Sequence, residues 1–172
     1  LECSSRMSIL EAVDKVNSNQ KTLLARKLIT HFNDNIEGKT IALWGLAFKP
    51  RTDDVREAPS LAIIDILTAG GAKIVAYDPK AIETTKAVIG DKIEYRDEQY
   101  KALEGADALM LVTEWNEFRE PDFEAMKQRM KAPIIFDGRN IWDPDKMRAR
   151  GFTYYCIGRP VVNGPECKCE MR

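Results

Sequence analysis

The chain has 172 residues, of which 26 are Lys or Arg and 27 are Asp or Glu, giving a formal net charge of −1. Such a balance provides no global field that would indicate nucleic acid or a membrane surface as a partner, so any function based on charge must be local. No apolar run is long enough to span a bilayer, and the first residues show no signal-peptide pattern. The length suits one sizeable core with an appendage.

Residues from about Ser8 to Asn35 have the period of one long helix, with no Gly or Pro inside it and Gly38 after its end. The apolar positions are Leu10, Val13, Val16, Leu23, Leu24, Leu28 and Phe32. At ~1.5 Å per residue the helix would be about 40 Å long, more than one face of a small α/β domain requires. Two interpretations stay open: a helix docked on the surface, or a spine that joins two domains or two subunits. We assign residues 1–37 to this helix and residues 38–172 to a second domain.

After Gly38 the sequence alternates between short apolar runs and helical patterns. Strands are predicted at 41–44, 74–77, 93–95, 108–112, 134–136 and 153–156. Helices are predicted between them at 61–69, 82–89, 99–103, 123–130 and 146–150. This alternation is typical of an α/β fold with a doubly wound, mainly parallel sheet and helices on both faces, here preceded by one long helix. The end of the chain from Arg159 lacks periodicity and is predicted to be poorly ordered.

Four cysteines and one histidine give little support for a metal site. Cys167 and Cys169 are separated by one residue, too close for the usual C-x-x-C hook, and Cys3 and Cys156 add no second hook. His31 lies within the long helical pattern. We expect reduced thiols in a cytoplasmic protein and no metal; the alternative is a disulfide or an artefactual metal-binding pair in the tail.

The segment from Gly45 to Pro59 follows the first predicted strand and precedes the next predicted helix. It carries three cations, three carboxylates and two prolines: Lys49, Arg51, Arg56, Asp53, Asp54, Glu57, Pro50 and Pro59. An ordinary connector of this kind is a few residues long, whereas this one is long, stiff and charged. Because open α/β sheets bind ligands where their strands end, the segment predicts a site for an anionic ligand.

Three further strand ends should lie on the same edge of a parallel sheet: residues 77–79, 112–116 and 136–140. Together with the first loop, this edge gathers cations and aromatic side chains, namely Lys49, Arg51, Arg56, Arg139, Phe48 and Trp115. Arg and Lys are the usual partners of phosphate, and aromatic faces can hold a base or a sugar. The edge therefore predicts a binding site for a nucleotide diphosphate.

Ordinary structural roles compete with ligand binding at this edge. Arg56 can form a loop-bracing ion pair with Asp53 or Asp54, and Trp115 suits the core as well as a ligand platform. Asp78 is more typical of a turn than of the ribose-binding carboxylate of a dinucleotide site, because the first loop lacks G-x-G-x-x-G. The sequence also lacks a G-x-S-x-G or Walker motif and a cysteine in a strand-end loop. These residues indicate a binding domain without a catalytic nucleophile.

Several motifs occur in an order that resembles the UDP-glucose/GDP-mannose dehydrogenase family, over the range from Val13 to about Gly158. They are Val16-Asn17-x-x-Gln20, the segment from Gly45 to Pro59, Tyr77-Asp78-Pro79, Thr113-Glu114-Trp115, and Phe136-Asp137-Gly138-Arg139-Asn140. Within the family, Pro50 and Thr52-Asp53-Asp54 in the first loop and the residues of the Asp-Gly-Arg-Asn motif favour the UDP-glucose branch. The alternatives are the UDP-N-acetylmannosamine and GDP-mannose branches, or a module that serves only for dimerisation.

The resemblance implies an enzyme that oxidises UDP-glucose to UDP-glucuronate in two hydride transfers to NAD, through a cysteine thioester. It implies a homodimer built through the long helix and a Rossmann-like domain, residues 38–172, that binds the UDP-sugar. The Gly-Gly-x-Cys-Phe motif of the catalytic cysteine and the NAD fingerprint are missing from this sequence, and Cys3 lacks the flanking residues of that motif. With no initiator Met at Leu1, we expect a piece of a longer protein that is inactive alone.

The resemblance also implies roles for individual residues. Those implied to contact the UDP-sugar are Phe48, Lys49 and Arg139. Arg56 would touch the NAD that another domain holds, and the carboxylates of Asp53 and Asp54 would orient these cations. Nucleic acid and membrane are not expected as partners.

Overall fold

The sheet of the computed structural model, which describes residues 8–164, has six parallel strands. They are β1 (Thr40–Trp44), β2 (Lys73–Tyr77), β3 (Glu94–Tyr95), β4 (Ala108–Leu111), β5 (Ile134–Asp137) and β6 (Thr153–Cys156). Their order is β3-β2-β1-β4-β5-β6, the order of the dinucleotide-binding Rossmann fold. The central strands β1 and β4 are buried almost throughout, as expected for a sheet covered on both faces. The predicted parallel α/β sheet is confirmed.

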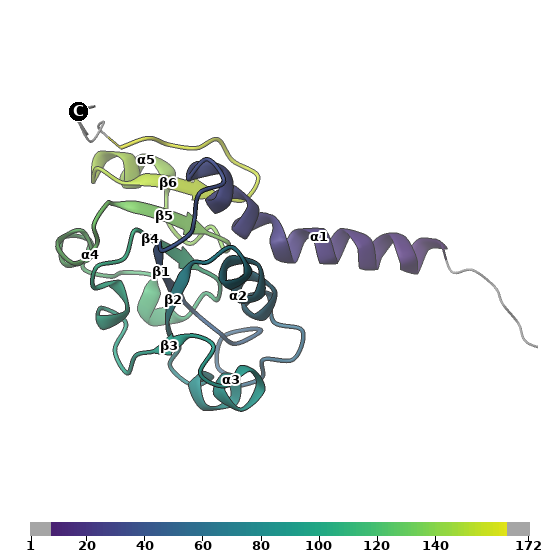
Figure 1. Cartoon of the computed structure of the whole chain (residues 1–172). Helices are drawn as coiled ribbons and strands as arrows, with labels where there is room; N and C mark the ends of the chain where they lie inside the picture. Colours follow the sequence, from purple (N-terminus) through teal and green to yellow (C-terminus); the bar gives the residue numbers. More distant parts are fainter. Residues whose placement is uncertain (1–7, 165–172) are drawn as a thin grey trace, which may run out of the picture.

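Helices cover both faces of the sheet (Figure 1). The helices α2 (Pro59–Ala69) and α3 (Ile82–Ile89) lie on one side, and α4 (Phe123–Arg129) lies on the other. The last helix is α5 (Pro144–Ala149), and two short 3-10 turns are η1 (Lys101–Leu103) and η2 (Asn116–Phe118). The aspartates that precede α4 and α5, Asp122 and Asp143, accept the hydrogen bonds of N-caps. The helix predicted at 99–103 is only a 3-10 turn, and η2 was not predicted.

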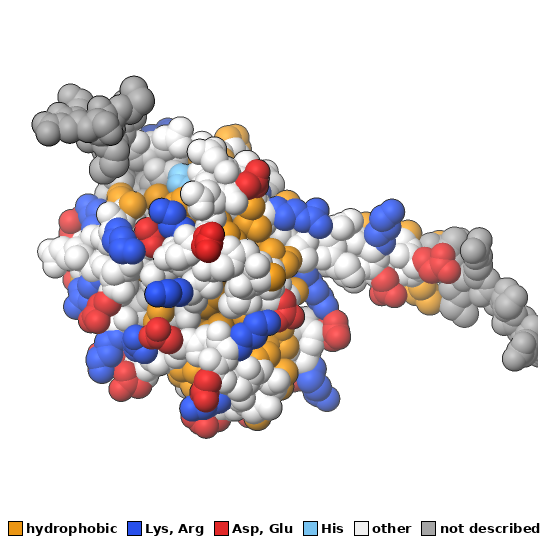
Figure 2. Space-filling model, viewed as in Figure 1, with side chains coloured by type: hydrophobic (Ala, Val, Ile, Leu, Met, Phe, Trp, Pro, Cys, Tyr) orange, Lys and Arg blue, Asp and Glu red, His pale blue; other side chains and the backbone are white. Residues whose placement is uncertain are grey.

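The first helix, α1 (Ser8–His31), is docked over one half and free-standing over the other. Leu24, Ala25 and Leu28 are buried where the helix packs against α2 and β5. Residues 9–20 are all exposed, and this half extends away from the domain (Figures 1 and 2). Large apolar side chains on it face solvent: Ile9, Leu10, Val13 and Val16. The docked interpretation therefore applies to the second half of α1, and the role of the projecting half as a spine that joins two domains or two subunits stays a prediction.

The predicted end of α1 at Asn35 is four residues too late. Asn33 and Asp34 adopt φ values of 52° and 62°, in the left-handed region that ends a helix, and the amide of Asp34 donates to the carbonyl of Ile29. Asn and Asp tolerate this conformation better than other non-glycine residues. In the last turn His31 Nδ1 lies 2.7 Å from the Tyr155 hydroxyl of β6, and burial lowers the pKa of the imidazole.

The prediction of a poorly ordered end from Arg159 is wrong for residues 159–164. Val162 forms an antiparallel bridge with Tyr154 through two backbone hydrogen bonds of 2.8 and 3.1 Å, and its side chain is buried. This pairing covers the free edge of β6, which gives the segment backbone partners despite its lack of periodicity. The predictions for Cys3, Cys167 and Cys169 lie outside the described residues. In the described part, no helix is long and apolar enough to cross a membrane.

Candidate functional site

The carboxyl ends of the central strands meet at one edge of the sheet. The ladder continues one residue past the strands, with Gly45 N donating to Tyr77 O, Val112 N to Trp44 O and Gly138 N to Leu111 O. Gly45 has a φ of 93°, and a Cβ built there would lie 2.6 Å from Thr113 Cβ. Only glycine allows the loops after β1 and β4 to approach this closely. The adjacent β1 and β4 are also the point where the strand order reverses, the usual ligand site of such folds.

Asp78, at the end of β2, holds three loops of this edge together. It is 1% exposed, and both carboxylate oxygens accept hydrogen bonds. The donors are the backbone amides of Leu46, Ala47, Lys80 and Ala81 and the indole Nε1 of Trp115, at 2.7 to 3.1 Å. Asp78 is therefore the turn residue favoured by the sequence, and Trp115 belongs to the core rather than to a ligand platform.

Asp137, the last residue of β5, holds the loop that follows this strand. Its buried carboxylate accepts hydrogen bonds from four successive backbone amides, residues 139–142, and from the Tyr154 hydroxyl at 2.7 Å. The neighbouring Asn140 has a φ of 55° and exchanges two hydrogen bonds with the backbone of Ile157. The Asp-Gly-Arg-Asn motif thus builds a rigid loop that presents the side chain of Arg139.

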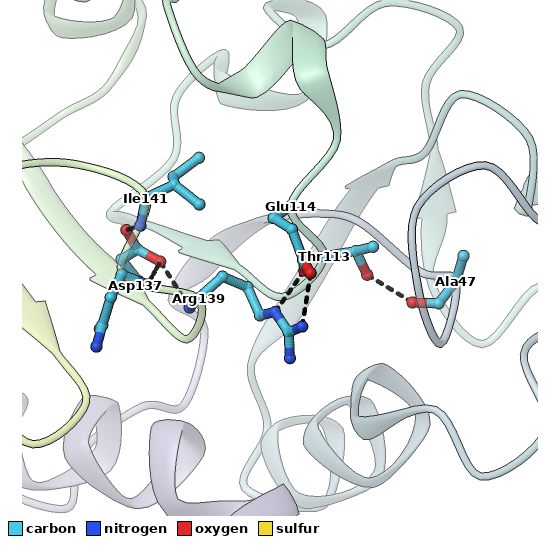
Figure 3. A network of polar contacts seen from close by, with 7 residues as sticks. Ala47, Thr113, Glu114, Asp137, Arg139 and Ile141 are labelled. Carbon is cyan, nitrogen blue, oxygen red and sulfur yellow. Dashed lines mark hydrogen bonds and ion pairs between the residues drawn. The ribbon is translucent and has the colours of Figure 1, made fainter.

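Figure 3 shows how the loops after β1, β4 and β5 are connected. The hydroxyl of Thr113 donates to the carbonyl of Ala47 at 2.5 Å, directly before Phe48. The guanidinium of Arg139 donates from two nitrogens to the two carboxylate oxygens of Glu114, with 2.7 Å for the contact between NH2 and Oε1. This ion pair lowers the pKa of the Glu114 carboxyl, so Glu114 stays ionised at neutral pH.

A groove of about 800 Å³ lies between α1 and this edge of the sheet. Helix α1 lines it with polar side chains, the loop after β1 contributes Phe48, and the loop after β5 contributes Arg139. The polar side chains of α1 are Asp14, Asn17, Ser18, Gln20 and Lys21. Lys21 is paired with Glu57 at 2.5 Å across the groove. The groove therefore combines an aromatic side chain with two cations and two carboxylates, and Arg139 is the cation in it suited to the anionic part of a nucleotide.

The structure places two of the predicted site residues in the groove and the other four outside its lining. Phe48, which is 49% exposed, and Arg139 lie in the groove. Lys49 is exposed on the same loop and makes no hydrogen bond or ion pair within residues 8–164. Asp53 lines a small hollow beside Lys80 rather than the groove.

Arg56 also lies outside the groove, in a bidentate pair with Asp54. Its Nε and NH2 atoms lie 2.9 and 2.8 Å from the two carboxylate oxygens, and the pair lowers the pKa of Asp54 to about 2. The Arg56 side chain is 87% exposed. The backbone carbonyl of Asp54 accepts from the amide of Phe48 at 2.8 Å, so the pair braces the loop that carries Phe48. This geometry agrees with the interpretation, made from the sequence, that Arg56 forms an ion pair that braces the loop.

Several contributions to this edge escaped sequence reasoning. The motifs that contain Glu114, Asp137 and the pair of Asn17 with Gln20 were noted, but no role was assigned to these residues. A carboxylate at the end of an apolar strand can indicate a residue that holds the next loop, because its oxygens can accept hydrogen bonds from the free backbone amides of that loop. No comparable signal predicts the pairing of Lys21 with Glu57, which depends on how α1 docks.

The described residues do not form a dinucleotide site of the Rossmann kind. Both oxygens of Asp78, the carboxylate at the place of the ribose-binding acid, are occupied by protein donors, and the side chain is buried. NAD therefore does not fit the end of β2. Among residues 8–164, no group of three or more His, Cys, Asp or Glu side chains is placed to hold a metal ion.

Fold and groove together define a Rossmann-like domain with a candidate nucleotide site at the carboxyl edge of its sheet. Residues 42–144, more than half of the chain, match the model of the UDP-glucose/GDP-mannose dehydrogenase family, UDP binding domain. The chain belongs to this family, as the order of its motifs implied.

Individual relatives agree with this assignment. The chain is 46% identical over 167 residues to a UDP-glucose 6-dehydrogenase of Pseudomonas aeruginosa, covering 94% of this chain and 36% of the relative. It is 42% identical over 158 residues to UDP-glucose 6-dehydrogenase TuaD of Bacillus subtilis, covering 92% and 34%. The solved UDP-glucose dehydrogenase of Pyrobaculum islandicum is 28% identical with a TM-score of 0.71, covering 87% and 32%. The chain thus spans about a third of the length of these proteins.

Proposed function

We propose that this chain is the UDP-sugar-binding part of an NAD-dependent UDP-glucose 6-dehydrogenase. The observation that carries the proposal is the groove beside α1, which is lined by Phe48 and Arg139. Both residues lie within the range that matches the family's UDP binding domain. The two relatives described above are UDP-glucose 6-dehydrogenases, which supports UDP-glucose over UDP-N-acetylmannosamine or GDP-mannose as the substrate.

Each predicted residue has a place in this proposal. Phe48 packs against the base or the sugar, and Arg139 binds diphosphate oxygens through charge-assisted hydrogen bonds. Lys49 adds positive charge from the rim of the groove. Arg56, held by Asp54 and exposed at the surface, faces the NAD carried by another part of the whole protein. Asp53, in the same loop, contributes to the charge balance around these cations.

In the whole protein the reaction oxidises the C6 alcohol of the sugar to a carboxylate with uptake of one water, and two molecules of NAD each accept one hydride. The residues of this chain bind and orient the UDP end and supply neither the cysteine nucleophile nor the NAD fingerprint. We assign residues 1–37, which include α1, to a linking and dimerising segment and residues 38–172 to the UDP-sugar domain. The chain alone should produce no NADH from UDP-glucose and NAD.

The first half of α1 supports a second candidate function, assembly of two copies. Four large apolar side chains on it are between 48% and 79% exposed, which is unusual for a helix with no partner. Light scattering of the chain in solution distinguishes the roles. A dimer that does not bind UDP favours an assembly module, whereas a monomer that binds UDP favours a binding module alone.

Calorimetric titration tests the binding role. We expect UDP to bind the chain, and uridine to bind at least tenfold more weakly, because Arg139 recognises the phosphates. The affinity should be low, because a site that the whole protein completes with another part has only some of its contacts here. Equal binding of UDP and uridine, or no heat with millimolar UDP, would contradict the proposal.

A further inference from the structure

We propose that Glu114 is a positioning residue for nucleotide binding: it fixes the guanidinium of Arg139 so that its remaining donors are presented to a diphosphate in the groove. The inference rests on the proposed function, because it concerns the same groove. In the Thr-Glu-Trp motif after β4, Thr113 and Trp115 hold the neighbouring loops through hydrogen bonds, whereas neither the fold nor the proposed contacts give Glu114 a role. The bidentate pair with Arg139 supplies one.

The geometry leaves part of the guanidinium available. An arginine side chain has five N–H donors in a fixed plane. Glu114 accepts from Nε and from NH2, one donor on each carboxylate oxygen. The NH1 group has no partner among residues 8–164, and NH2 keeps its second hydrogen. Because Arg139 lines the groove, these three donors form a fork that matches the oxygens of a phosphate.

Both ends of the pair are anchored to buried groups. The backbone amide of Arg139 donates at 2.7 Å to Asp137, whose carboxylate is fully buried. Glu114 follows Thr113, which is buried and bonded to the carbonyl of Ala47. A long side chain held at both ends loses less conformational freedom when it binds a ligand. The pair is therefore an arrangement in which Arg139 is already oriented before the nucleotide arrives.

A second Glu–Arg pair in the chain provides a matched comparison. Glu94 and Arg96 are two residues apart on β3 and its end, with NH2 and Oε2 2.7 Å apart, and they do not line the groove. Their side chains are 60% and 38% exposed, against 23% and 39% for Glu114 and Arg139. Glu94→Gln removes an equivalent charge at a distance from the proposed site.

The test is a calorimetric titration of UDP into the chain and its Glu114→Gln, Glu94→Gln and Arg139→Ala variants, and into the Glu114→Gln/Arg139→Ala double variant. The Gln amide has only one acceptor oxygen, and its NH₂ group would face a donor of the guanidinium, so Glu114→Gln cannot reproduce the pair and should weaken UDP binding about fivefold to tenfold. Glu94→Gln should leave the affinity unchanged. Once Arg139 is Ala, the Glu114→Gln change should have no further effect, because its role acts through Arg139.

A spectroscopic readout separates positioning from general stability. In ¹⁵N-labelled protein, the Nε–H signal of Arg139 should be visible in the wild type without ligand and should disappear in Glu114→Gln. UDP affinity that is unchanged or higher in Glu114→Gln, or an equal loss in the Arg139→Ala background, would overturn the inference and leave the proposed function standing. Absence of UDP binding by the wild type would overturn the proposed function, and with it the ligand part of the inference.

Discussion

Replacing Asp78 by Ala should destabilise the domain by about 3–5 kcal/mol, the largest stability effect expected at this edge of the sheet. The carboxylate accepts five hydrogen bonds, and their donors lie in the loops after β1, β2 and β4. The amides of Leu46 and Ala47 are buried, so they would have no water to replace the lost acceptor. Each orphaned buried donor costs about 1–3 kcal/mol. Urea unfolding followed by circular dichroism measures the change.

Asp145→Ala is the matched control for this experiment. The Asp145 side chain is 87% exposed, and within residues 8–164 it pairs only with Arg148, one turn further along α5. Exposed ion pairs contribute little, so the control should change the free energy of unfolding by no more than about 0.5 kcal/mol. If Asp78→Ala is as mild as the control, Asp78 does not hold the loops together as described.

Replacing Arg139 by Ala should weaken UDP binding by about 10- to 150-fold. A hydrogen bond to a charged group contributes about 1.5–3 kcal/mol, and Arg139 is the cation that the Asp-Gly-Arg-Asn loop presents in the groove. The fold should be kept, because the loop is held by Asp137 and by the backbone rather than by the guanidinium. Calorimetric titration of UDP measures the affinity, and the urea midpoint checks the fold.

Arg96→Ala serves as the control, because Arg96 is also paired with a glutamate but lies at the end of β3, outside the groove. It should leave the UDP affinity unchanged. Comparable losses in both variants would indicate a general charge effect and would remove Arg139 from the site. In the whole protein, Lys49→Ala should also weaken the use of UDP-glucose, by less than Arg139→Ala because Lys49 does not line the groove.

The sequence predicted helices and strands well where burial and hydrophobic periodicity determine the local structure. All six strands were predicted within two residues of their observed ends, because apolar runs in a two-sided parallel sheet admit few alternatives. The end of α1 was predicted less well, since Asn33 and Asp34 end it through backbone conformation rather than through a change in hydrophobic pattern. The bridge of Val162 to Tyr154 is a long-range pairing that local patterns do not encode.

At the candidate site, the sequence indicated the edge of the sheet where the site lies, but not which side chains pair with one another there. The position of Arg139 after a strand was sufficient to place it there, and the strand order confirms that the loops share one edge. The pairing of Arg139 with Glu114 depends on the adjacency of β4 and β5, which follows from topology alone. The groove depends on the docking of α1, whose second half packs on α2 and β5 and so encloses a surface that loops would otherwise leave open.

The most direct test of the account is the location of bound UDP. In ¹⁵N-labelled chain, titration of UDP should shift the backbone amide signals of Phe48, Gly138 and Arg139, together with those of Asn17 and Lys21 on α1. These residues line the groove from three separate segments, so their joint response would place the nucleotide there. Shifts confined to the far edge around β3, or no shifts with millimolar UDP, would contradict the assignment of this groove as the UDP-sugar site.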